Sequence, residues 1–293
     1  MERPLVSIGM PVYNAEEYIG RSIDSVLNQT YSNLELIISD NASTDSTQEI
    51  CKKYLKMDSR ISYYRLEKNF GAAINFNSTF NLSNGEYFKW QAHDDIMANS
   101  YLSKCLNILK NDRQIVLCHT FDQVIDEVGK RKKVLSFQNI NFNEKLVYQN
   151  YLKFLKNFRY GQDEATVVNG LFRTDVLALT NLIGNYNSSD LVLLAQIVLC
   201  GKIEIINECL FFKRYHKNKS TQANRTNKEI AKWFDTSSKG NQIPLIIWFT
   251  KFLQAVGSNR EMTINQKVIC YLSTIRWFFY RIFKGLRRRL KVM

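Results

Sequence analysis

The 293-residue chain is poor in the residues that mark loop-rich, disulfide-bonded or zinc-binding proteins. It contains 3 Pro and 12 Gly, too few for a collagen-like or linker-rich protein. Its 3 His are scattered and its 6 Cys form no CxxC pair, so we expect reduced thiols and no zinc site. With 45% hydrophobic and 23% charged residues, the composition favours a globular fold over disorder.

Long apolar segments are also missing from the sequence. No run of 18 apolar residues occurs, which predicts no membrane-spanning helix. The N-terminal residues lack the basic start and the long apolar stretch of a secretory signal. Together with reduced cysteines, these absences predict a cytoplasmic protein.

Short apolar runs alternate with segments of helical spacing over the first hundred residues. Strands are expected at 5–10, 34–39, 61–66 and 86–91, and helices at 15–29, 45–57 and 70–82. This alternation is typical of βαβ units. It predicts an α/β fold with a mostly parallel, Rossmann-like central sheet flanked by helices.

The pattern is less regular beyond residue 100. We expect helices at 100–110, 188–200 and 243–256, and strands at 115–121, 166–172, 203–206 and 209–215. Residues 137–165 are rich in Asn, Phe and Tyr without clear periodicity, which favours an insertion or a flexible lid. The predicted organisation is a first domain of residues 1–222, with halves 1–120 and 121–222, followed by a helical region of residues 223–293.

Charge is unevenly distributed over a net +13, because residues 1–100 carry 9 basic and 13 acidic side chains and residues 101–293 carry 31 and 14. From Lys267 onward, apolar residues recur on one face of a predicted helix, and no acid follows Glu261. The apolar positions are Val268, Tyr271, Leu272, Ile275, Phe279, Ile282, Leu286 and Leu290. The basic positions are Lys267, Arg276, Arg281, Lys284, Arg287, Arg288, Arg289 and Lys291.

Such a basic amphipathic helix is typical of contact with an anionic membrane surface. The alternative is a helix that packs on the protein and leaves a solvated basic face. Nucleic-acid binding is not expected, because the basic stretch is aromatic and apolar and no nucleic-acid motif accompanies it.

Polar side chains follow three of the predicted strands, where ligands of parallel sheets bind. Tyr13 offers a ring on which a base can stack, unless it is a turn residue. Asp40 could accept hydrogen bonds from a base or a ribose, or could cap a helix. The adjacent Asp94 and Asp95 need a cation or hydroxyls unless water solvates them, and carboxylates with substrate phosphates suit Mg²⁺ or Mn²⁺.

The order of these motifs is more specific than any one of them. PVYN, SVLNQTYSNLELIISDNASTD, NFGAAINFN and the aspartate pair resemble the donor-binding half of a family 2 glycosyltransferase with the type-A nucleotide-sugar fold. The resemblance is strong over residues 4–120 and weaker over 166–220. It implies that 1–222 is a catalytic domain, with a nucleotide-sugar half (1–120) and an acceptor-side half (121–222).

The resemblance also implies roles for matching residues. Tyr13 would stack on the base, Asp40 would hydrogen-bond it, and Asn69 and Gly71 would close over the nucleoside. The full set of expected donor-binding residues is Pro11, Tyr13, Asn14, Asp40, Asn69, Gly71, Asp94 and Arg214. The expected metal ligands are Asp94, Asp95 and His216, with Arg214 against phosphate oxygens.

Asp190 opens a predicted helix in the sequence SSDL. In the family, a carboxylate at this helix start is the general base for the acceptor hydroxyl, and Ser189 stands where many members carry Glu. The alternative for Asp190 is a charge that merely favours the helix dipole. Two positions depart from the family: Ala92 replaces a common acid, and Phe76-Asn77 replace a motif that often contains Arg.

The resemblance implies inverting transfer from a nucleoside-diphosphate sugar, by default a UDP-sugar, to a hydroxyl. The basic helix suggests a lipid-linked or polysaccharide acceptor of bacterial-type surface glycan synthesis, at the inner face of the plasma membrane. A catalytically weak nucleotide-sugar-binding scaffold is the main alternative, favoured by Ala92 and the missing Arg. A nucleotidyltransferase is disfavoured, because PVYNAEEY lacks a Gly/Arg-rich phosphate loop.

Overall fold

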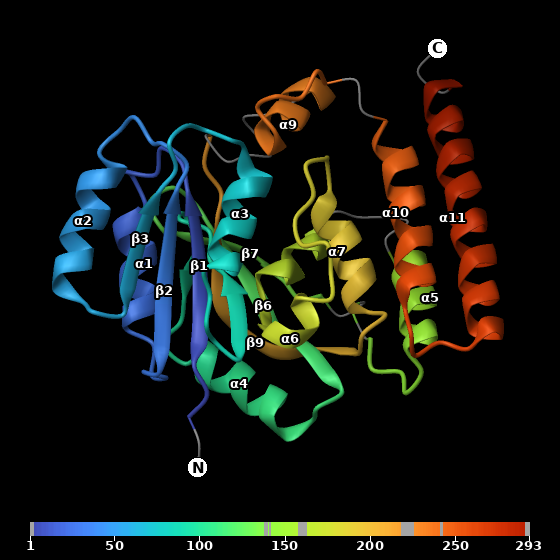
Figure 1. Cartoon of the computed structure of the whole chain (residues 1–293), viewed down its shortest axis with the longest axis horizontal. Coiled ribbons are helices and arrows are strands. Elements are labelled where there is room, and N and C mark those ends of the chain that lie inside the picture. Colours follow the sequence, from blue (N-terminus) through green and yellow to red (C-terminus); the bar gives the residue numbers. More distant parts are fainter. Residues whose placement is uncertain are drawn as a thin grey trace.

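A single twisted sheet runs through the molecule with helices on both faces (Figure 1). The computed structural model describes residues 3–137, 140, 142–157, 163–217, 226–240 and 243–290. Its strands are β1 (Val6–Val12), β2 (Leu34–Asp40), β3 (Ile61–Arg65), β4 (Tyr87–Trp90), β5 (Ile96–Met97), β6 (Ile115–Ile125), β7 (Arg131–Leu135), β8 (Leu171–Arg173) and β9 (Lys202–Arg214). Their order in the sheet is β3-β2-β1-β4-β8-β6-β9-β5, and β7 pairs with β6.

The helices lie mostly between consecutive strands in the first half and gather at the far end in the second. They are α1 (Ile19–Leu27), α2 (Thr47–Met57), α3 (Ala72–Asn81), α4 (Tyr101–Asn111), α5 (Val147–Asn157), α6 (Thr174–Leu177), α7 (Ser189–Ile197), α9 (Asn227–Phe234), α10 (Pro244–Ser258) and α11 (Ile264–Leu290). A 3-10 helix, η1, covers Asp163–Asn169.

The predicted α/β architecture is confirmed. Strands β3, β2, β1 and β4 are parallel, and β6 and β9 run parallel to each other. Strand β8 is antiparallel to both β4 and β6, and β5 and β7 are antiparallel edges. Val12 pairs with Asp40 and Asp40 pairs with Arg65, so the carboxyl ends of three neighbouring strands meet at one level.

Close packing of helices on the sheet follows directly from the sequence. Every residue of β1 is buried, as expected for a strand covered on both faces. A Cβ on Gly9 would lie 2.3 Å from the Oγ1 of Thr79, so only glycine lets α3 pack this closely on β1. Ile19, Ile23 and Val26 form the buried face of α1.

Three elements of the second half differ from the sequence-based predictions. Residues 166–169 belong to η1, and the strand after it is only β8. The two strands expected at 203–206 and 209–215 are one strand, β9, whose register with β6 shifts beside Phe121. Nor is 137–165 an aperiodic insertion, because α5 occupies its centre and buries Tyr151 and Phe154. Residues 138, 139, 141 and 158–162 lie outside the described part of the chain.

The C-terminal helices share a core with the acceptor-side half. Trp248 and Phe252 of α10 and Trp277 of α11 belong to one apolar cluster with Tyr151 and Phe154. Helices α5, α10 and α11 form a layer at the end of the molecule opposite α2 (Figure 1). The predicted boundary at residues 222 and 223 lies outside the described residues. None of the helices within those residues combines the length and apolarity needed to cross a bilayer.

Candidate functional site

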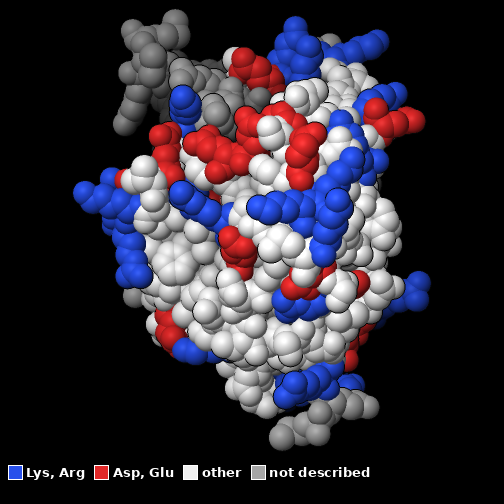
Figure 2. Space-filling model, turned by 90° about the vertical axis from the view of Figure 1, so that its left-hand side faces the viewer, with Lys and Arg blue, Asp and Glu red and all other residues white. Residues whose placement is uncertain are grey.

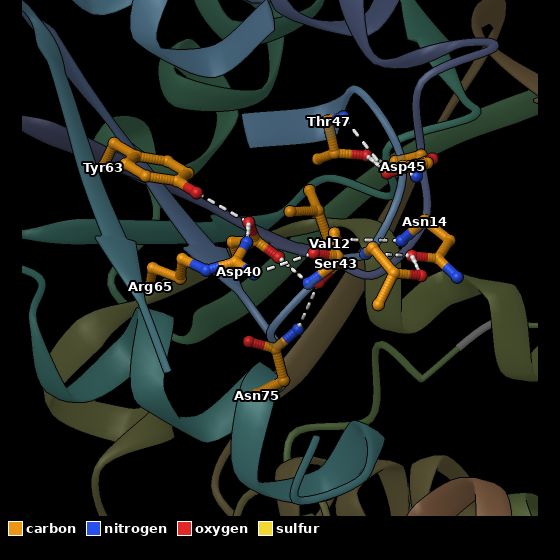
Figure 3. A network of polar contacts seen from close by, with 11 residues as sticks. Val12, Asn14, Asp40, Ser43, Asp45, Thr47, Tyr63, Arg65 and Asn75 are labelled. Atoms are coloured by element: carbon orange, nitrogen blue, oxygen red, sulfur yellow. Dashed lines mark hydrogen bonds and ion pairs between the residues drawn. The ribbon is translucent and has the colours of Figure 1, made fainter. Parts of the chain in front are cut away.

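The loops that follow β1 and β2 are hydrogen-bonded to each other (Figure 3). Asn14 donates its backbone N–H to Ser43 Oγ at 2.9 Å, and its Oδ1 accepts from the backbone N–H of Thr44 at 2.8 Å. Asn14 has a φ of 49°, a left-handed conformation that Asn tolerates better than most residues. Pro11 is buried in β1. Tyr13, between Pro11 and Asn14 in the chain, is 43% exposed.

Asp40 is buried at the end of β2 and accepts three hydrogen bonds. Its Oδ1 accepts from the backbone N–H of Ser43 at 2.8 Å. Its Oδ2 accepts from the hydroxyl of Tyr63 at 2.6 Å and from Arg65 Nη1 at 2.7 Å. Burial, and secondly the bond to Asp40, raise the pKa of Tyr63.

The structure therefore places Asp40 in the same loop cluster as Tyr13, but covers its carboxylate with protein donors. This corrects the expectation that Asp40 directly faces a base. Sequence analysis missed Tyr63 and Arg65, although Arg65 ends β3 as Asp40 ends β2. A search for polar side chains at the end of β3, like the one made for the other strands, would have found Arg65.

Asn69 and Gly71 lie in a loop held by Asn41, a residue that sequence analysis also missed. Asn41 Nδ2 donates to Asn69 Oδ1 at 2.9 Å, and its Oδ1 accepts from the backbone N–H of Phe70 at 2.9 Å. Thr236, which follows α9, donates to the Asn69 carbonyl at 3.0 Å. Gly71 has a φ of 92°, and an added Cβ would lie 2.5 Å from the carbonyl oxygen of Phe234. The loop is therefore closed from above by the end of α9.

The Asp94-Asp95 turn is fixed by β9. Asp95 Oδ1 accepts from the backbone N–H of Arg214 at 2.8 Å, and His216 Nε2 lies 2.9 Å from Asp94 Oδ2. The Arg214 side chain donates to the carbonyls of Asp94, Asp126 and Glu127, each at 3.0 Å.

Arg214 is thus placed differently from the prediction. It is 1% exposed, and the donations just described direct its guanidinium at main-chain oxygens. This geometry assigns it a positioning role for the aspartate turn rather than contact with a phosphate.

The expected three-residue metal set is only partly assembled. Asp94 and His216 are in contact, but Asp95 is turned toward the Arg214 backbone. Among the described residues, no group of three or more His, Cys, Asp and Glu side chains could hold a metal ion. His216 Nδ1 is buried without a hydrogen-bond partner within that part of the chain. One carboxylate and one imidazole could hold a divalent cation that takes its other ligands from substrate phosphates and water.

Asp190 lies in the first turn of α7. Ser188, its N-cap, has a left-handed φ of 56°, and Trp248 of α10 donates to the Asn187 carbonyl at 2.7 Å. Asp190 Oδ1 accepts from the backbone N–H of Leu191 at 2.9 Å. Burial raises the pKa of Asp190, while this hydrogen bond and the charge of Lys213 oppose the rise. Lys213, the residue before Arg214 on β9, is therefore a charged group that acts on Asp190.

Solved structures with a similar fold cover nearly the whole chain. S. aureus TarS 1–349 in complex with UDP-GlcNAc has a TM-score of 0.64 at 14% identity, over 94% of this chain and 72% of that one. The mannosyltransferase PcManGT from Pyrobaculum calidifontis, in complex with GDP-Man and Mn²⁺, has a TM-score of 0.55 at 13% identity, over 98% and 88%. The fold is therefore the type-A glycosyltransferase fold.

The family model for Glycosyl transferase family 2 matches residues 7–175, more than half of the chain. The chain belongs to this family, as the motifs predicted. An uncharacterized glycosyltransferase of Haemophilus influenzae is 37% identical over 136 residues, 46% of this chain and 54% of that protein. The putative teichuronic acid biosynthesis glycosyltransferase TuaG of Bacillus subtilis is 39% identical over 107 residues, 36% and 42%. The chain thus spans about half the length of these relatives.

Proposed function

We propose that the protein transfers a sugar from a nucleoside-diphosphate sugar to a hydroxyl acceptor, with inversion at the anomeric carbon. The observation that carries this proposal is that Tyr13, the Asn69–Gly71 loop and Asp94, the partner of His216, follow the carboxyl ends of the parallel strands β1, β3 and β4 of one sheet. The UDP-GlcNAc bound by S. aureus TarS and the GDP-Man bound by PcManGT support a nucleotide-sugar donor.

In this proposal the oxygen of the acceptor hydroxyl attacks the anomeric carbon of the donor sugar. Asp190 removes the proton of that hydroxyl in the same step. The bond to the diphosphate breaks, and the nucleoside diphosphate leaves with the electron pair. Mg²⁺ or Mn²⁺, when bound, would neutralise charge on that leaving group. Asp94 and His216 would hold it, and Arg214 and Asp95 would keep their turn in place.

A donor panel tests the proposal and separates it from the scaffold alternative. Thermal shift with UDP-, GDP-, CDP- and ADP-sugars, with and without Mn²⁺, identifies the donor that binds. Slow metal-dependent release of the nucleoside diphosphate is then expected from an active transferase, and Asp94→Asn should abolish it. Binding without any turnover would favour a nucleotide-sugar-binding scaffold, and no binding at all would reject the proposal.

We also propose that α11 rests on an anionic membrane at the inner face of the plasma membrane, where a lipid-linked or polysaccharide acceptor is presented. Among the described side chains of the apolar row predicted from the sequence, Val268, Leu272, Ile275 and Phe279 are exposed, Leu272 at 63% and Phe279 at 52%, whereas Tyr271 packs against the core. The helix packs instead through Cys270, Thr274 and Trp277, on the opposite side.

The charge pattern supports an anionic surface as the partner of this row. Acidic and basic side chains mix on the opposite end of the molecule (Figure 2), whereas α11 carries Lys and Arg without acids. Arg281 is an exception, because it stacks over the buried Trp277 at 5.8 Å and faces the protein. The name of TuaG, a teichuronic acid biosynthesis enzyme, supports a surface-glycan acceptor.

Vesicle flotation tests the membrane contact. The double variant Leu272→Ser/Phe279→Ser should lose binding to vesicles rich in phosphatidylglycerol while keeping its melting temperature, because both side chains are exposed. Leu179→Ser is the matched control, since this leucine is 78% exposed outside α11. Binding that survives the double variant would reject the membrane role of this face.

A further inference from the structure

Of the ion pair that ends β2 and β3, Arg65 is the partner with exposed side-chain surface. Asp40 has no exposed side-chain surface, whereas 33% of the Arg65 side chain remains exposed. We infer that Arg65 reads the nucleobase of the donor and selects uracil or guanine over cytosine and adenine. This inference deepens the proposed function and rests on it.

The guanidinium is held in a fixed orientation by two acceptors (Figure 3). Arg65 Nη1 donates to Asp40 Oδ2 at 2.7 Å, and Nη2 donates to the Ser43 carbonyl at 2.8 Å. These two bonds use two of the five N–H groups of a guanidinium. The Tyr63 hydroxyl donates to the same oxygen, Oδ2, and the Ser43 backbone N–H holds the other oxygen, Oδ1, so the carboxylate itself is a rigid support.

Ser43 also links Arg65 to the stacking residue. Its carbonyl accepts from Arg65, and its Oγ accepts from the backbone N–H of Asn14, the residue after Tyr13. Because Val12, Asp40 and Arg65 are also paired in register, the Tyr13 ring and the guanidinium border the same loop. A base stacked on Tyr13 would then direct one edge toward Arg65.

The chemistry of the base edge decides which bases this arrangement accepts. Uracil carries an oxo group at C4 and guanine one at C6, and both accept hydrogen bonds from a guanidinium. Cytosine and adenine carry an amino group at the same place, which would set donor against donor. An unpaired donor at a buried contact loses affinity, so the amino bases should bind more weakly.

Isothermal titration of UDP, GDP, CDP and ADP in the presence of Mn²⁺ tests the inference. The wild-type protein should bind UDP or GDP at least about 10-fold more tightly than CDP and ADP. Arg65→Lys keeps a positive charge beside Asp40 but loses the fork, and should bring the four affinities to within about threefold. The matched control is Arg60→Lys, because Arg60 pairs with Asp58 at the other end of β3, and its preference should match wild type.

The outcomes separate this inference from the proposed function. Equal binding of all four nucleotides by the wild type, or an unchanged preference in a folded Arg65→Lys, overturns the inference and leaves the glycosyltransferase proposal standing. If no nucleoside diphosphate binds, the proposed function fails and the inference falls with it. Melting temperatures of both variants show whether a loss of preference is merely a loss of folding.

Discussion

Asp40 on the proposed donor side and Asp190 on the proposed acceptor side stand in opposite electrostatic settings, the first buried and the second half-buried. Asp40, on the donor side, accepts from a guanidinium, a phenol and a backbone N–H. Asp190, on the acceptor side, accepts from the Leu191 backbone, and burial raises its pKa. The donor side thus uses its carboxylate to fix its own loops. The acceptor side keeps a carboxylate whose charge is poorly stabilised, which is what a general base requires.

The largest effect should follow from changing the acceptor-side carboxylate. Asp190→Asn removes the proposed base while keeping its shape, so turnover should fall about 10³-fold or more with donor affinity retained. In the wild type, kcat/KM should rise with pH through an apparent pKa above that of an ordinary aspartate, because the charged form is the active one. Steady-state kinetics across pH measures both effects.

Asp175→Asn is the control for that experiment. Asp175 also lies in the first turn of a helix, α6, and accepts from the next backbone N–H at 2.8 Å, but it is exposed. Its replacement should leave turnover unchanged. Near-normal turnover in Asp190→Asn would show that the two aspartates are alike and would remove Asp190 from the mechanism.

Asp40→Asn and Asp190→Asn should change the stability of the protein in opposite directions. Asp40→Asn removes the buried carboxylate of the ion pair with Arg65 and places an amide against two donors, which should cost about 1–3 kcal/mol. Asp190→Asn should instead raise the free energy of unfolding at pH 7. The folded-state pKa of Asp190 is raised, so its stabilising contribution is complete below the unfolded pKa and is lost as pH rises through the folded pKa.

Urea denaturation at pH 7 and at pH 4 measures these differences. The gain from Asp190→Asn should shrink at the lower pH, where the wild-type carboxyl is more fully protonated. If Asp40→Asn and Asp190→Asn lowered the free energy of unfolding equally at pH 7 and at pH 4, the distinction between a supporting and a reactive carboxylate would be wrong.

The sequence predicts the donor side well because its information is local. Tyr13, Asp40 and Asp94 each follow an apolar strand, and parallel strands bring their carboxyl ends together without knowledge of distant residues. The burial of Arg214 could not be predicted in this way. Its acceptors include the carbonyls of Asp126 and Glu127, nearly ninety residues earlier in the chain.

The C-terminal helix shows the same limit. Its apolar row was visible as periodicity, but which face packs on the protein depends on α5 and α10. The buried face includes Thr274, whose hydroxyl pairs with that of Tyr151 at 2.8 Å. A polar residue at the centre of the packed face gives no apolar signal, so the pattern alone does not show which face packs on the protein.

A substitution at Gly71 tests how firmly the end of α9 packs on the loop that contains Asn69 and Gly71. Gly71→Ala should cost about 2–4 kcal/mol, because both the positive φ and the approach of the Phe234 carbonyl oppose a Cβ. Gly129→Ala is matched in φ, at 95°, but no atom lies within 4 Å of its Cβ position. It should cost only about 1–2 kcal/mol. Equal costs in thermal denaturation would mean that the loop and α9 separate readily.

A buried lysine of the central sheet extends the comparison of buried charged groups, and its effect is expected as a gradual slope with pH. Lys89 of β4 has no exposed surface and donates to the carbonyls of Trp90 at 3.0 Å and Asn169 at 2.5 Å. Burial lowers its pKa to about 7. The unfolded chain therefore binds more protons than the folded one between about pH 7 and the ordinary lysine pKa, so stability should rise with pH there by at most about 1.4 kcal/mol per unit.

Lys89→Met should flatten that rise, and the variant's own lost hydrogen bonds should appear as a constant offset rather than a slope. Lys104→Met is the control, because Lys104 is exposed and pairs with Glu208 at the surface. Urea denaturation at half-unit steps from pH 6.5 to 9 would reveal the slope. A wild-type profile as flat as that of Lys89→Met would mean that Lys89 keeps its proton throughout. Its charge would then be stabilised inside the protein as well as that of Asp40.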